Sequence, residues 1–250
     1  MFGDVCHDDR RNQTGGVRDV SVITPESTAE LYVEAHDRVV GLVRGLSAEQ
    51  AATRVAATPE WTVHDVVAHL AAIPTDIVAG RLKGIPRPEE TQQQVDARRD
   101  AAIPALLEEW AAGVDPIVEL ARAGLIPPPL TIDVITHEQD LRGAIHAAHL
   151  DDDAALRFAV TGYSMGLARR IKAAGLRALR LRDPARGFDT TAGEGEPAAT
   201  VSGREFDLFR ALAGRRSRAQ VEAFDWIGDP APYLDVFCVF GPLAETDISD

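Results

Sequence analysis

The stretch from Leu130 to Arg142 reads LTIDVITHEQDLR. Apolar residues recur through it and just beyond it at spacings of four and seven, which is typical of a helix with one buried face; they are Leu130, Val134, Leu141, Ile145 and Ala148. His137 falls within this stripe, with Asp133 one turn before it and Asp140 just under one turn after it. Burying such groups costs free energy unless they hydrogen-bond or bind a metal. The stretch therefore predicts a helix that contributes a buried polar site.

The whole sequence has the composition of a soluble globular protein. Its 250 residues suffice for one large domain or two modest ones, with 45% hydrophobic and 26% charged residues. The net charge of -13 disfavours a nucleic-acid partner, because binding phosphates needs a basic face. No run of about 18 apolar residues is present, so no membrane span is expected. We interpret the local basic cluster as a solvated helix end and edge strand rather than an anion site; its members are Arg169, Arg170, Lys172, Arg177, Arg180 and Arg182.

The cysteines and the N-terminal residues bear on the cellular compartment that the sequence predicts. Cys6 and Cys238 lie far apart and form no CxxC pattern, so neither a disulfide framework nor a cysteine zinc site is expected. A reducing cytoplasm is the natural compartment. Residues 1–23 are polar and lack both periodicity and an apolar signal core. They are expected to be a disordered tail or an extension upstream of the true start, and His7 is therefore discounted as a ligand.

The remaining chain predicts a helical part followed by a small mixed part. The expected helices are Thr24 to about Leu46, a short segment from Ser47, Thr62 to about Leu82, Glu89 to about Gly124, the helix quoted above, and Ala154 to about Ala174. Glu89 to Gly124 is expected in two pieces, because Pro104 and Pro116 suit first-turn positions rather than helix interiors. Residues 57–60 are expected to form a loop. Short strands are expected at Leu176–Arg182, Phe188–Thr191 and Ala198–Ser202. Another helix is expected at Ser202–Ala213. The fold class is thus α+β, with a helical domain at 24–175 and an α+β domain at 176–250.

A second segment, WTVHDVVAHL at residues 61–70, carries another candidate ligand. Helical angles place His69 beside the apolar stripe of this segment and His64 on the opposite side. In a bundle, His69 can meet Asp133 and His137 from another helix, and two nitrogens with one carboxylate suit zinc, nickel or ferrous iron. The alternatives are a simple hydrogen bond between Asp133 and His137, and a buried histidine at the core edge for His69.

Three segments carry a family resemblance: WTVHDVVAHL at 61–70, DVITHEQDLR at 133–142 and SGREFDLFRALAGR at 202–215. Together they resemble the mycothiol-dependent maleylpyruvate isomerase family, an actinobacterial branch of the DinB-like metal-binding four-helix proteins. The resemblance covers about Thr24 to Pro242. It implies a DinB-like four-helix bundle followed by a small C-terminal α+β domain, with mycothiol as the thiol cosubstrate.

The resemblance also implies roles for individual residues. The family's metal ligands are a histidine in its AHL motif and a glutamate and a histidine four residues apart. His69 and His137 match in kind, whereas Asp133 stands at the glutamate position and is one methylene shorter. Asp140 matches an acid of the motif, which implies either orientation of His137 or a catalytic proton step.

Other polar residues receive less specific interpretations. Arg81, Arg204 and Arg215 are candidates for holding an anionic substrate or the thiol cofactor. Arg142 is expected to pair with Glu138, either within the site or as a surface ion pair of little energetic value. The residues interpreted as structural are Trp61, as a packing anchor at a helix start, and His146 and His149, near a helix end.

Two functions from different classes follow. In the first, a metal, with zinc favoured, binds and activates a low-molecular-weight thiol that attacks a small electrophile, giving thiol transfer or isomerisation. In the second, the bundle binds a small molecule or a partner without catalysis and the polar trio is vestigial. A regulator that binds nucleic acid is disfavoured by the charge. The sequence does not predict the substrate or the oligomeric state.

Overall fold

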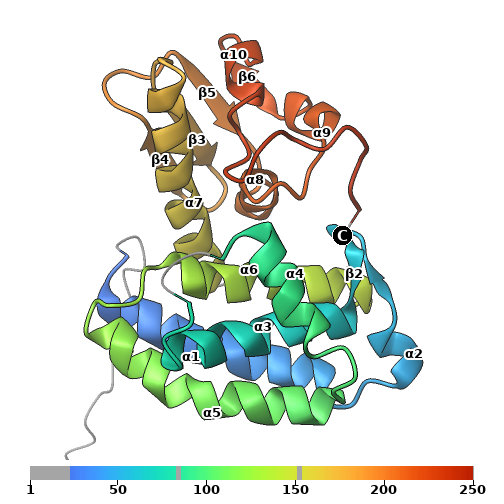
Figure 1. Cartoon of the computed structure of the whole chain (residues 1–250). Helices are drawn as coiled ribbons and strands as arrows, with labels where there is room; N and C mark the ends of the chain where they lie inside the picture. Colours follow the sequence, from blue (N-terminus) through green and yellow to red (C-terminus); the bar gives the residue numbers. More distant parts are fainter. Residues whose placement is uncertain (1–22, 83–85, 151–153, 250) are drawn as a thin grey trace, which may run out of the picture.

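The structure is a computed structural model that describes residues 23–82, 86–150 and 154–249 (Figure 1). The expected tail, with Cys6 and His7, lies outside these residues except for Ile23. The N-terminal part is built from long helices; these are α1 (Pro25–Val43), α3 (Val63–Val78), α5 (Ile103–Arg122) and α6 (Pro129–Ala144). Short elements fill the connections: α2 (Ala48–Ala51), β1 (Arg54–Val55), β2 (Thr58–Thr62) and α4 (Pro88–Asp96).

The C-terminal part combines a small sheet with helices. It contains α7 (Ala154–Ala173), β3 (Leu179–Asp183), β4 (Phe188–Ala192), β5 (Ala199–Ser202), α8 (Glu205–Leu212), α9 (Arg218–Glu222), β6 (Asp225–Ile227) and α10 (Ala231–Leu234). The strand order is β4-β3-β5-β6, in which β3 and β5 run parallel and the other neighbours run antiparallel. The predicted α+β class is confirmed.

Local capping chemistry fixes where the first helices begin. Thr24, Ser47 and Thr62 each accept a hydrogen bond from a backbone N–H three residues on, and the side chain at that position bonds back to the cap. At α3, for example, the Thr62 N–H donates to Asp65 Oδ2 at 2.8 Å, and the Asp65 N–H donates to Thr62 Oγ1 at 3.2 Å. These reciprocal bonds satisfy amide groups that a helix start leaves unpaired. All three starts were predicted from the sequence.

Three expectations about secondary structure were wrong. Pro116 lies inside α5 rather than at a first turn; the carbonyl that it leaves without a donor belongs to Ala112, which is exposed, so water can bond it. The segment expected to be a loop at 57–60 contributes to β2, whose pairing with β1 is a tertiary feature that residue propensity does not encode. The short helix α9 was not expected.

Close approach of α3 and α5 depends on a glycine. A Cβ atom built on Gly113 in α5 would lie 2.8 Å from Cβ of Pro74, which is buried within α3. A contact of that length is shorter than a normal carbon–carbon separation. Gly113 therefore lets α5 pack directly against the helix that carries His69.

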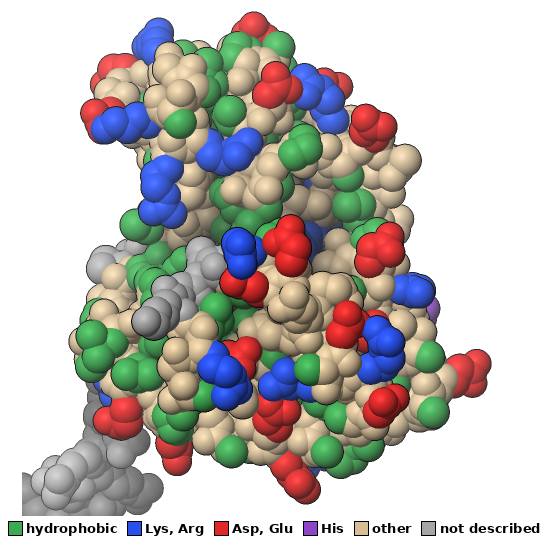
Figure 2. Space-filling model, viewed as in Figure 1, with side chains coloured by type: hydrophobic (Ala, Val, Ile, Leu, Met, Phe, Trp, Pro, Cys, Tyr) green, Lys and Arg blue, Asp and Glu red, His purple; other side chains and the backbone are tan. Residues whose placement is uncertain are grey.

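The two parts of the chain share one hydrophobic core. The core cluster runs without interruption from Ala29 in α1 to Leu243 near the C-terminus. Helix α7 packs against α6 of the bundle and also against α8 and β4 (Figure 1). Figure 2 shows the two parts as lobes with a hollowed waist between them. Among the described residues, no helix combines the length and apolarity that spanning a membrane requires. Helix α6, with its polar residues, thus lies where the two parts pack against each other.

Candidate metal centre

His69, Asp133 and His137 come together from two helices. His69 lies on α3, and Asp133 and His137 lie one turn apart on α6. The His69 Nε2 atom is 3.1 Å from Asp133 Oδ2, and the His137 Nε2 atom is 3.6 Å from Asp133 Oδ1. One ligand atom from each residue lies within 4.8 Å of the others, which makes this trio a candidate metal site.

The donor set and its spacing fit a metal ion. Two ligands of a tetrahedral zinc ion, each about 2.0–2.1 Å from the ion, lie about 3.3 Å apart. The two contacts of Asp133, one from each carboxylate oxygen, are 3.1 and 3.6 Å and so lie close to that separation. Both imidazoles are buried, whereas the Asp133 side chain is 35% exposed. The trio thus has one open side, and the shorter acid still reaches both histidines.

Asp140 fixes the second nitrogen of His137. Its Oδ2 atom is 3.0 Å from His137 Nδ1, so the Nε2 atom is the one that faces Asp133. A histidine that binds a metal usually donates its other ring N–H to a carboxylate or a carbonyl. Asp140 therefore occupies the position of such an orienting carboxylate.

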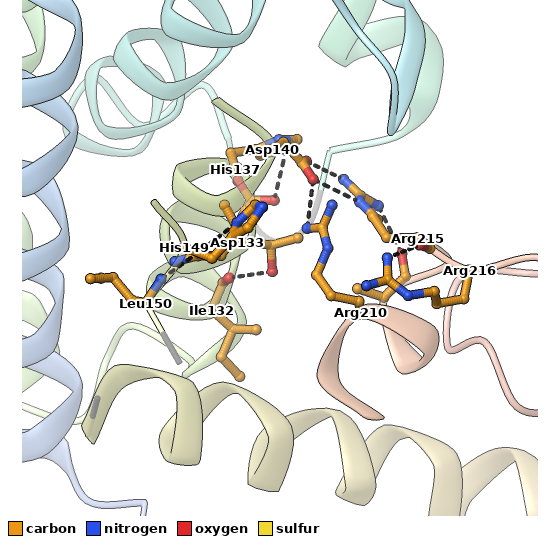
Figure 3. Close-up of polar contacts among 12 residues, drawn as sticks. Ile132, Asp133, His137, Asp140, His149, Leu150, Arg210, Arg215 and Arg216 are labelled. Carbon is orange, nitrogen blue, oxygen red and sulfur yellow. Dashed lines mark hydrogen bonds and ion pairs between the residues drawn. The ribbon is translucent and has the colours of Figure 1, made fainter. Parts of the chain in front are cut away.

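Two arginines from the C-terminal part hold Asp140 (Figure 3). Arg210, at the end of α8, donates from Nη1 to Oδ1 at 2.7 Å, and Arg215 donates from Nη2 to Oδ2 at 2.8 Å. Burial raises the pKa of the Asp140 carboxyl, but Arg215 and Arg210 outweigh that effect and hold the pKa well below its usual range. A carboxylate held this way is a weak base, which favours the orienting role over the proton-transfer role.

The charge state of Asp133 is set by the same neighbours that would share a metal with it. Burial raises its pKa, while His69 and His137 lower it by more, so that the net pKa lies below its ordinary value. Asp133 is thus held as the carboxylate, the form that binds a metal.

A buried hydroxyl pair lies beside this cluster. Tyr163 of α7 and Thr136 of α6 share a hydrogen bond of 2.7 Å, and Asp133, Asp140 and Arg215 all act on the phenol's titration. Burial is the largest effect and raises the pKa of Tyr163. Tyr163 therefore stays protonated at neutral pH.

Of the three arginines predicted to bind an anion, Arg215 contacts Asp140, which in turn contacts His137 of the trio. Arg81 follows α3 and pairs with Asp76 on the surface, and Arg204 pairs with Asp207 at the start of α8. A binding role for Arg81 and Arg204 stays a prediction from the resemblance alone.

The predicted pair of Arg142 and Glu138 is present and is buried. Arg142 Nη2 donates to Glu138 Oε1 at 2.8 Å, and Arg38 of α1 donates from Nε to the same oxygen at 2.9 Å. The Glu138 side chain is fully buried. The surface alternative for this pair is therefore wrong, because the carboxylate ties α1 to α6.

His64 and the two histidines interpreted as structural, His146 and His149, lie near the ends of helices. His64 contacts the Ala101 carbonyl through Nε2 at 2.7 Å, at the start of α3. His146 has a φ of 56° just after α6, the left-handed conformation common where a helix ends. His149 contacts Gln139 Oε1 at 3.3 Å.

Two residues at the site were missed by sequence reasoning. The Trp61 ring, expected to be only a packing anchor, lies 5.2 Å from the His69 ring and 6.1 Å from the His137 ring. Arg210 is fully buried. A signal for Arg210 was available, because it follows Phe206 by four residues and so falls on the apolar face of its helix.

The chain resembles one family in sequence and in fold. Residues 32–125 match the family model of the mycothiol maleylpyruvate isomerase N-terminal domain. The crystal structure of a histidine-to-alanine variant of the mycothiol-dependent maleylpyruvate isomerase has a TM-score of 0.56 and 14% identity, covering 82% of this chain and 93% of that chain. Another structure of that isomerase has a TM-score of 0.51 and 14% identity, covering 77% and 90%. No curated protein sequence matches the chain.

These similarities agree with the motifs in the sequence. At 14% identity the solved structures show the fold alone, while the family model identifies the N-terminal domain directly. The matched range includes His69 and ends just before α6, which supplies the rest of the trio. Over residues 32–125 the chain is therefore similar to the N-terminal domain of the mycothiol maleylpyruvate isomerase family.

Proposed function

We propose that the chain is a metal-dependent enzyme that uses a low-molecular-weight thiol, with mycothiol as the thiol, to act on a small electrophilic substrate. The observation that carries this proposal is the convergence of His69, Asp133 and His137 with one side open. Three protein ligands and an open position are the pattern of catalytic rather than structural zinc sites.

The residues of the site have two roles in this proposal, metal binding and orientation of a ligand. His69, Asp133 and His137 would hold the ion, with zinc favoured and nickel or iron as alternatives. Bound at such a site, a metal lowers the pKa of a coordinated thiol and so supplies a thiolate at neutral pH. Asp140 orients His137 through the Nδ1 contact of 3.0 Å.

Arg215 places a positive charge beside the site. Its guanidinium is held by Asp140, and its side chain is 13% exposed. Its charge is also one of the smaller effects that lower the pKa of Asp133. Because a guanidinium binds carboxylates well, Arg215 is the best placed of the candidate arginines to attract an anionic substrate or thiol.

The chemistry is addition of sulfur to an electrophilic carbon. The thiol loses its proton, its sulfur forms a C–S bond, and the substrate carbon chain takes up the electron pair and then a proton. If the product leaves with the sulfur attached, the reaction is a thiol transfer. If the addition is to a carbon–carbon double bond and rotation about the resulting single bond follows, loss of the added proton re-forms the double bond and expels the thiolate. The thiolate regains a proton, the thiol is unchanged, and the reaction is an isomerisation.

The alternative is a bundle that binds a small molecule or a partner without catalysis. The contact of 3.1 Å between His69 and Asp133 supports it, since a hydrogen bond alone would hold these residues together. In this case the trio would be a vestigial site.

Metal content separates the two functions. The protein, purified without a chelator or a histidine tag, is expected to contain about one zinc per chain by elemental analysis. His137→Ala is expected to lose the metal, because two ligands bind far more weakly than three. His64→Ala is the matched control, since His64 lies on α3 but contacts the Ala101 carbonyl. Wild-type protein without metal, and unable to take it up, would overturn the enzyme proposal.

Thiol binding is tested on the cobalt-substituted protein. Addition of mycothiol is expected to change the visible absorption of bound cobalt, because a sulfur ligand enters its coordination sphere. An unchanged spectrum at saturating thiol would rule out direct coordination of the thiol.

A further inference from the structure

The two histidines of the trio are oriented by different means. His137 contacts the Asp140 carboxylate through Nδ1 at 3.0 Å. Among the described residues, neither Nδ1 atom has a partner with hydrogen-bond geometry, but His137 Nδ1 faces the Asp140 carboxylate, whereas the carboxylate contact of His69 is made by Nε2. A histidine ligand usually relies on such a partner to fix its ring. The orientation of His69 therefore needs another source.

The indole of Trp61 is the aromatic surface against which both histidines lie. Its ring centroid is 5.2 Å from that of His69 with an interplanar angle of 45°, and 6.1 Å from that of His137 with an angle of 33°. These separations fall within the range of favourable ring contacts. The side chain is half-buried.

The indole is itself held in place. Trp61 is part of β2 and directly precedes Thr62, the N-cap of α3. Its Nε1 donates to Gln92 Oε1 of α4 at 3.2 Å, and Gln92 Nε2 donates to Asp96 Oδ1 at 3.1 Å. The backbone of Trp61 is thus held by the start of α3, and its indole N–H is held by Gln92 of α4.

We propose that Trp61 is the positioning residue for His69, taking the place of the hydrogen bond that His69 Nδ1 lacks. The proposal rests on the proposed function, because it assigns the indole to the metal-binding geometry. Rotation about the outer side-chain torsion of histidine is broad, and without a bond at Nδ1 the packing of the indole has to restrict it. In its present orientation His69 directs Nε2 at Asp133.

A purely structural Trp61, as expected from the sequence, makes a different prediction. A packing anchor would stabilise the helix start and leave metal binding unaffected once the protein is folded. A positioning residue affects the metal affinity of the folded protein and the mobility of one imidazole. The two roles are therefore separable by measurements on folded variants.

The first experiment measures metal affinity. Trp61→Ala and Trp61→Leu are expected to weaken zinc and cobalt binding by about 10-fold or more, the usual effect of losing a group that orients a ligand. Trp61→Phe keeps a flat ring and is expected to retain most of the affinity. Trp226→Ala is the matched control, since Trp226 packs against Tyr233 and Phe237 in the C-terminal part. The melting temperature of each metal-free variant shows that it is folded, and Trp61→Leu fills enough volume to serve if Trp61→Ala does not fold.

The second experiment needs no metal. In nuclear magnetic resonance spectra of the metal-free protein, the imidazole signals of His69 are expected to broaden or double in Trp61→Leu. Those of His137 are expected to stay sharp, because Asp140 still holds that ring. Unchanged His69 signals together with unchanged affinity would overturn the proposal. Wild-type protein that binds no metal but shows the His69 effect would overturn the proposed function and leave Trp61 as the residue that positions His69.

Discussion

Asp140 contributes both to the stability of the fold and to the geometry of the candidate site. It contacts His137 and accepts hydrogen bonds from Arg210 and Arg215. The Arg210 side chain and the Asp140 side chain are both fully buried. Removing one partner of a buried ion pair leaves the other charge without compensation, which is more costly than never burying the pair.

Asp140→Asn is expected to lower the free energy of unfolding by about 3–5 kcal/mol, because two guanidinium groups lose their counter-charge. Urea unfolding of the metal-free protein measures this loss. Asp207→Asn is the matched control: Asp207 also lies between two arginines, Arg204 and Arg216, but its side chain is 21% exposed. The control is expected to cost about 1 kcal/mol or less. Equal losses in both variants would contradict the burial argument.

The candidate site was predictable where local periodicity carries it. His137 and Asp133 could be assigned to one helix face because they are four residues apart, and His69 because it borders an apolar stripe. The meeting of the two helices was predicted from the convergence of side chains in a helical bundle, and the family resemblance supported it. The burial of Arg210 could be read from the apolar face of its helix, but its contact with Asp140 and that of Trp61 with His69 could not, because both depend on tertiary packing.

At the scale of elements, Gly113 tests how closely α3 and α5 pack. Gly113→Ala gains about 1 kcal/mol of helix propensity, but overpacking of a core contact costs about 1–3 kcal/mol. The new Cβ would meet the rigid Pro74 ring at 2.8 Å, so we expect net destabilisation. Gly41→Ala in α1 is the control, since nothing lies within 4 Å of its Cβ position; it is expected to raise stability. Thermal unfolding of both variants gives the two signs, and a more stable Gly113→Ala would show that the helices can separate without cost.

The elements were predicted best where their ends are chemically marked. Thr24, Ser47 and Thr62 cap their helices through bonds that span three residues, so the sequence contains the whole interaction. The interior position of Pro116 and the strand β2 depend on solvent exposure and on a partner strand. Neither condition is visible within a short window of sequence.

At the scale of the whole molecule, the candidate site lies where the two parts of the chain join. The core cluster includes buried residues of both parts. The buried bonds from Arg210 and Arg215 to Asp140 cross the same junction, and Arg157 of α7 binds Glu205 of α8. The domain boundary that we propose near residue 175 falls after α7, which packs against α6 before it and against α8 and β4 beyond it. The contacts across this boundary couple the stability of the two parts.

This coupling predicts a single unfolding transition that responds to metal as a unit. Calorimetry of the metal-free protein is expected to show one peak whose calorimetric and van't Hoff enthalpies agree. Zinc at about 100 times its dissociation constant adds about 2.7 kcal/mol of stability, which corresponds to a rise in Tm of about 5–10 °C for a chain of this size. The whole peak is expected to move, because the ligands on α3 and α6 are packed against the part that holds Asp140. His137→Ala is expected to lose the shift but keep the single peak. Two peaks, of which zinc moves only one, would show that the C-terminal part folds independently of the bundle that carries the site.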